Sequence, residues 1–95
     1  MQFNFEDFNG CVDQPFTLQL DDATYPLTLI SANKLPNSAA LGDREAFSIV
    51  FRGEGSVVLE QQIYRMRNDK LGEMDLFIVP IGPDEKGMCY EAVFS

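Results

Sequence analysis

The sequence contains no histidine, no tryptophan and only two cysteines among its 95 residues. Without histidine, the chain lacks the usual general base at neutral pH and the commonest metal ligand. Patterns such as GxxxxGK[ST], GxGxxG and GxSxG, which mark phosphate-binding loops and nucleophile elbows, are absent as well. The 15 acidic residues supply carboxylate pairs by chance, and the acidic turns at 21–22 and 83–87 lack the ligand spacing of a calcium loop. We therefore expect no enzyme activity, no catalytic residue, no cofactor and no metal.

Basic residues are also scarce, since 7 of them oppose 15 acids and leave a net charge of −8. Such a surface repels phosphate backbones and anionic lipids, so we expect no nucleic-acid partner. No apolar run approaches the roughly 20 residues of a membrane-spanning helix, which argues against membrane insertion. A signal peptide has a basic start followed by an apolar stretch. The sequence does not show this pattern, so we expect a cytoplasmic protein. Cys11 and Cys89 then remain reduced as small apolar side chains, and a disulfide between them is the alternative.

The apolar residues, 45% of the chain, alternate with polar ones and predict a single β domain over residues 1–95. The stretch "FTLQL" places Phe16, Leu18 and Leu20 on one face of a strand, and "YPLTLIS" follows it to complete a hairpin over 16–31. "FSIVF" predicts a third strand with Phe47, Ile49 and Phe51 facing inward. The continuous run 76–79 suggests a strand that is covered on both faces, and 73–95 form the terminal hairpin. The expected fold is all-β, an antiparallel meander of five or six strands closed into a barrel or a compact sandwich.

Two segments are ambiguous in the local pattern. In "VVLEQQIYRMR", Leu59, Ile63 and Met66 have helical spacing, whereas period two places Val58, Tyr64 and Met66 on one face of a strand. Residues 1–10 fit a short strand, a helical turn or a flexible arm. Neither segment is assigned from its own residues.

The C-terminal half carries a distinctive set of motifs: Gln61, Tyr64, the Leu71–Gly72 turn, the run Leu76–Gly82 within an "LFxVPIG" strand, and "YEAVF" at Tyr90–Phe94. At these positions the chain resembles a family of small bacterial domains of unknown function. The resemblance extends over roughly residues 8–95 and implies a stand-alone β domain in which 59–67 form a strand. It implies no activity. It also suggests an association with phage-tail-like collar or fibre proteins.

Binding is the function class that remains. We expect a non-catalytic structural or protein-interaction module that contacts another protein or itself, as an accessory or subunit of a phage-tail-like assembly. A small-molecule or carbohydrate-binding barrel is the alternative. Apolar residues off the inward faces, aromatics at the N-terminus and two arginines near an acidic hairpin are the interface candidates. These residues are Phe3, Phe5, Ile30, Val57, Val58, Arg65 and Arg67, with Val50 as a further outward apolar position. For the two phenylalanines the alternative is packing within the domain, and for the arginines it is cross-strand charge pairing.

Overall fold

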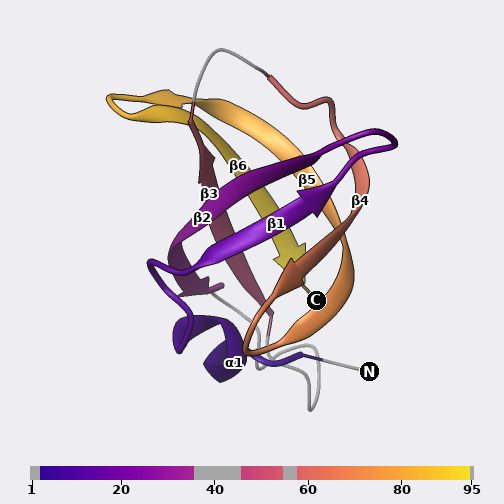
Figure 1. Ribbon diagram of the computed structural model, residues 1–95. Helices are drawn as coiled ribbons and strands as arrows, with labels where there is room; N and C mark the ends of the chain where they lie inside the picture. The colour runs from indigo at the N-terminus through magenta and orange to yellow at the C-terminus, as the bar shows by residue number, and fades with distance from the viewer. Residues whose placement is uncertain (1–2, 36–45, 55–57, 95) are drawn as a thin grey trace.

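The computed structural model describes residues 3–35, 46–54 and 58–94. A short helix, α1 (Phe5–Asn9), precedes six strands. The strands are β1 (Pro15–Gln19), β2 (Thr24–Lys34), β3 (Phe47–Gly53), β4 (Gln62–Asn68), β5 (Gly72–Asp84) and β6 (Gly87–Phe94). All six pair in antiparallel fashion and close into a barrel, which confirms the expected fold class (Figure 1).

The order of strands around the barrel is β1-β2-β3-β6-β5-β4. Two three-stranded meanders, β1–β3 and β4–β6, are therefore joined side by side. A meander throughout would pair β3 with β4, whereas here β3 pairs with β6, and β4 closes the barrel against β1. β3 and β4 are thus consecutive in the chain but not neighbours in the barrel.

The inward faces follow the alternation in the sequence. Phe16 and Leu18 on β1, Leu27 and Leu29 on β2, and Phe47, Ile49 and Phe51 on β3 are all buried, as predicted. Leu20 was expected to extend the β1 row, but β1 ends at Gln19 and the Leu20 side chain is 40% exposed. The ambiguous segment forms a strand, β4, with Tyr64, Met66 and Asn68 inward, so period two and the resemblance are both confirmed there.

The terminal hairpin also forms as predicted, with its turn between Asp84 and Gly87. Pro80 has no amide donor, yet it pairs with Tyr90, and the strand continues to Asp84 after a register shift between Pro80 and Gly82. An irregularity at this position accommodates the missing proline donor without ending the strand.

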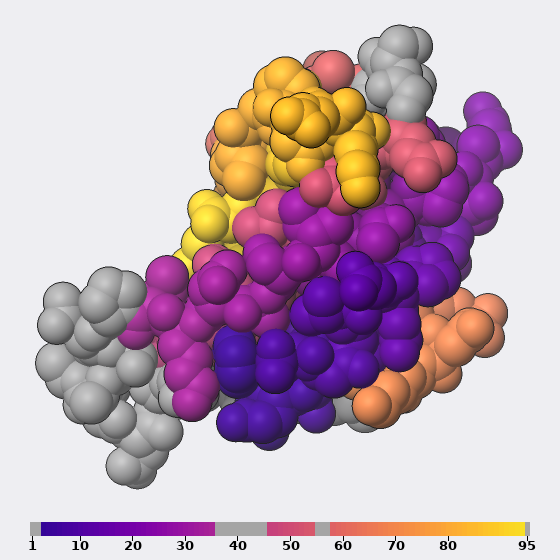
Figure 2. Space-filling view, turned by 90° about the vertical axis from the view of Figure 1, so that its left-hand side faces the viewer, coloured from indigo at the N-terminus to yellow at the C-terminus, as the bar shows by residue number. Residues whose placement is uncertain are grey.

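Residues 3–10 adopt the helical alternative and cover one end of the barrel. Asn4 caps α1 through a capping box, in which the Asn4 side chain accepts from the Asp7 amide and the Asp7 carboxylate accepts from the Asn4 amide. The helix turns Phe8 into the core, where its ring packs 5.2 Å from that of Phe94 and 6.0 Å from that of Phe47. Figure 2 shows α1 lying against β2 at this end of the molecule.

Within the described part of the chain, no helix combines the length and the apolar character needed to cross a bilayer.

Candidate functional site

Four adjacent strands carry apolar side chains on the outside of the barrel. We call this surface the outer apolar face and define it as Ile63 of β4, Phe77 and Val79 of β5, Val93 of β6 and Val50 of β3. Ile63 is 66% exposed, Phe77 50% and Val93 59%, while Val79 and Val50 are half-buried. Single exposed apolar residues are ordinary on protein surfaces, but a contiguous group indicates an interaction surface.

The strand pairing makes these residues neighbours. Ile63 and Phe77 are directly opposite each other in the β4–β5 ladder. Val79 lies two residues after Phe77 and therefore on the same side of β5. Glu91 of β6 pairs with Val79 on one side and with Val50 on the other, so one carboxylate sits between two valines.

The exposure of Phe77 corrects the prediction that residues 76–79 are covered on both faces. Leu76 and Ile78 are 6% and 0% exposed, whereas Phe77 between them points to solvent. The physical reason is the position of α1, which covers the end of the barrel and contacts β2 rather than the outside of β5. With no described element over it, the outer side of β5 stays apolar and exposed.

Charged residues border the outer apolar face. The Arg65 Nε donates to Asp75 Oδ1 at 2.6 Å, and its Nη1 lies 3.6 Å from Glu73 Oε1. This confirms the predicted cross-strand charge pairing for Arg65, whose pKa is raised by the hydrogen bond to Asp75. Arg67 faces Glu73 in the ladder, but no ion pair between them occurs within the described residues. Instead, Arg67 lines a depression with Asp69.

The two N-terminal phenylalanines pack against their own barrel. The ring of Phe3 lies 5.6 Å from that of Phe8, and the ring of Phe5 lies 6.1 Å from that of Phe47. The Lys34 ammonium sits 5.2 Å from the centre of the Phe5 ring. Both phenylalanines stay partly exposed, so their docking onto another chain stays a prediction, while packing within the domain is the arrangement that the structure contains.

The other candidates are scattered. Ile30 falls at the register shift between Leu29 and Ser31 on β2 and is half-buried. Val58 is 57% exposed in the segment before β4, and Val57 lies outside the described residues. Sequence reasoning thus found Val50 but missed Ile63, Phe77, Val79 and Val93. The signal for Ile63 was present, because period two in β4 places it opposite Tyr64 and Met66.

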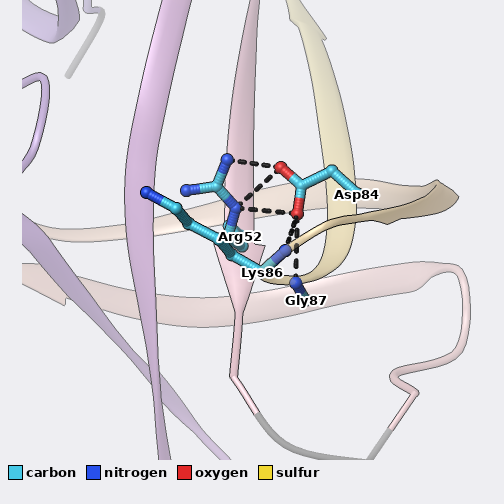
Figure 3. A network of polar contacts seen from close by, with 4 residues as sticks. All are labelled: Arg52, Asp84, Lys86 and Gly87. Atoms are coloured by element: carbon cyan, nitrogen blue, oxygen red, sulfur yellow. Dashed lines mark hydrogen bonds and ion pairs between the residues drawn. The ribbon is translucent and has the colours of Figure 1, made fainter.

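A second polar cluster holds the terminal hairpin in place (Figure 3). The Asp84 carboxylate accepts from Arg52 Nε at 3.1 and 2.8 Å and also from Nη2. Asp84 Oδ1 further accepts from the amides of Lys86 at 2.8 Å and Gly87 at 3.0 Å. The Arg52 guanidinium, aided by the Lys86 amide, holds the pKa of Asp84 far below its usual range. Both oxygens of the Asp84 carboxylate are thus engaged in shaping the turn, a role for which Asp is a common choice.

The two cysteines are free and lie in different surroundings. Cys11 is buried, with its Sγ 3.7 Å from Asn68 Oδ1. Burial raises the pKa of the Cys89 thiol, and the nearby Asp84 carboxylate raises it further. The raised pKa makes Cys89 a poor nucleophile at neutral pH. Among the described residues, no group of three or more Cys, Asp or Glu side chains could hold a metal ion.

A polar depression of about 240 Å³ lies on the outside of β1, β2 and β4. Its lining residues are Pro15, Thr17, Gln19, Thr24, Arg67 and Asp69. Sites for small molecules usually have volumes of about 300 Å³ or more and are mostly apolar. This depression has no aromatic wall and falls below that size.

Comparison with known proteins identifies the chain only at the level of a family. No curated protein and no solved structure matches it significantly. The model of one family, described as a domain of unknown function, DUF6916, matches residues 3–94. The match covers nearly the whole chain and agrees with the resemblance seen in its C-terminal half. The protein therefore belongs to the DUF6916 family.

Proposed function

We propose that this protein is a non-catalytic protein-interaction module that binds a partner protein through the outer apolar face. The observation that carries the proposal is the directly paired, solvent-exposed Ile63 and Phe77. Two large apolar side chains in contact with water are costly to leave uncovered, and their burial favours association by about 1.5–3 kcal/mol for each fully buried side chain.

The alternative, a barrel that binds a small molecule or a sugar in its mouth, has less support. The interior is occupied by large, fully buried side chains, among them Phe8, Phe16, Phe51 and Tyr90. A barrel of this size is just wide enough for its own side chains. Membership of a phage-tail-like assembly stays a prediction that depends on the sequence resemblance alone.

The test compares wild-type protein with an Ile63→Ser, Phe77→Ser double variant and with Val58→Ser as the matched control. Val58 is 57% exposed, similar to Phe77, but is not part of the outer apolar face. Each protein is immobilised and exposed to an extract of the source organism, and the affinity of any retained protein is then measured after purification. Circular dichroism checks that all three proteins are folded.

A partner that binds the wild type and Val58→Ser equally, and the double variant about 30-fold or more weakly, is the expected result, since central apolar contacts carry most of the energy of an interface. If the partner bound all three proteins equally, its binding site would lie elsewhere on the barrel and the proposal would be refuted.

A further inference from the structure

Strand β4 is paired along only part of its length on the side facing β1. The β1–β4 ladder joins Thr17–Gln19 to Arg65–Arg67 and ends there. Gln62–Tyr64 pair with β5 on their other side, but no described strand pairs with them on the β1 side. A short open edge therefore lies directly beside Ile63 of the outer apolar face. An unpaired edge of this kind accepts an additional extended strand.

The charges around this open edge are acidic. Glu60 is exposed two residues before β4 begins. Asp21 and Asp22 are exposed in the β1–β2 turn, which follows the last β1–β4 pair, Gln19 with Arg65, and lies beside the same part of β4 (Figure 1). The nearest arginine, Arg65, is already engaged by two acids, Asp75 and Glu73. A segment docking here meets uncompensated negative charge.

We infer that the partner presents a basic, extended segment that adds to the open edge of β4 and places its apolar side chains beside Ile63, which Phe77 flanks on the other side. Main-chain hydrogen bonds to β4 and alternating side-chain contacts are the recognition mode of strand addition. Charge complementarity selects a segment rich in Lys or Arg. A second copy of this chain would bring like charges together, because its net charge is −8. This inference rests on the proposed function and specifies the partner.

Labelled synthetic peptides test it by fluorescence anisotropy. The probe is an eight-residue alternating Lys-Val peptide, and the controls are a Glu-Val peptide of the same length and a Lys-Val peptide with alternate backbone amides methylated. The protein variants are Ile63→Ser, Phe77→Ser, and a triple variant that combines Asp21→Asn, Asp22→Asn and Glu60→Gln. Measurements at low and at high salt separate the electrostatic contribution.

We expect the Lys-Val peptide to bind at least about tenfold more tightly than either control peptide, because charge and main-chain pairing both contribute. The triple variant should weaken this binding by about three- to tenfold, and Ile63→Ser should weaken it by at least about tenfold. Folding of the variants is checked by circular dichroism, and their solution mass by light scattering.

Three outcomes would overturn the inference: equal binding of the Glu-Val peptide, equal binding of the methylated peptide, or no binding of any peptide. A wild-type dimer that dissociates in Phe77→Ser would also overturn it, because the occupant would then be a second copy. These results leave the proposed function intact as long as Phe77→Ser and Ile63→Ser still abolish binding of a partner protein. Only insensitivity of that partner to both substitutions refutes the proposed function itself.

Discussion

The hydroxyl of Tyr90 provides a specific test of how the barrel is closed. The Tyr90 side chain on β6 is fully buried, and its Oη accepts a hydrogen bond from the Leu59 amide at 2.9 Å. Leu59 is 5% exposed and lies in the described residues 58–61 that lead into β4. This bond thus ties the entry to β4 to β6, the strand that lies between β3 and β5.

Replacement of Tyr90 by Phe removes the acceptor and leaves the Leu59 amide buried without a partner. An unsatisfied buried donor costs about 1–3 kcal/mol of stability. For a domain of this size, each kcal/mol lowers Tm by about 4–8 °C. We therefore expect Tyr90→Phe to unfold about 4–24 °C below the wild type.

Tyr64→Phe is the matched control. The Tyr64 hydroxyl donates to the Glu60 carbonyl at 2.8 Å, but Glu60 is exposed, so water replaces the lost donor. Tyr64→Phe should therefore lower the free energy of unfolding by less than about 1 kcal/mol. Thermal and urea unfolding followed by far-UV circular dichroism measure both variants, since the chain has no tryptophan. If Tyr90→Phe were no less stable than Tyr64→Phe, the assigned role of the Tyr90–Leu59 bond would be wrong.

Two further predictions concern the terminal hairpin. Because the folded-state pKa of Asp84 is lowered by Arg52, its stabilising contribution is present above about pH 4, the ordinary aspartate pKa, and is lost as the pH falls through the folded-state value. Urea unfolding at pH 7 and at pH 2–3 should therefore show Asp84→Asn less stable than wild type at neutral pH, with a smaller difference in acid. If Asp84→Asn and the wild type differed in stability by the same amount at both pH values, the stabilising role of the Arg52–Asp84 ion pair would be contradicted. A Cβ on Gly87 would lie 2.1 Å from the Gly53 carbonyl oxygen, so Gly87→Ala should cost about 1–3 kcal/mol in the same assay. Gly72→Ala, at a φ of +83° with open space around it, measures backbone strain without a clash, and an equal cost for both would show that the close contact has no effect.

Much of the fold could be predicted from local pattern because burial on one side of a strand imposes period two. This alternation predicted the inward positions on β1 and β3, and all five predicted residues are buried: Phe16, Leu18, Phe47, Ile49 and Phe51. The turn residues between Asp84 and Gly87 likewise predicted the terminal hairpin. These features depend on residues a few positions apart, which a single sequence displays directly.

What the sequence by itself determined was the class of the fold and most of its core, whereas the order of the strands and the interaction surface depended on tertiary structure. Local pattern does not reveal that β3 pairs with β6 and not with β4, because either pairing would satisfy the same alternation of apolar and polar residues. The run 76–79 looks equally apolar on either face, and Phe77 is exposed because no described element covers the outer side of β5 there. Ile63 and Phe77, 14 positions apart in the chain, become neighbours only when β4 and β5 pair in their observed register. Exposure is a property of what packs against a residue, so the tertiary arrangement alone decides it.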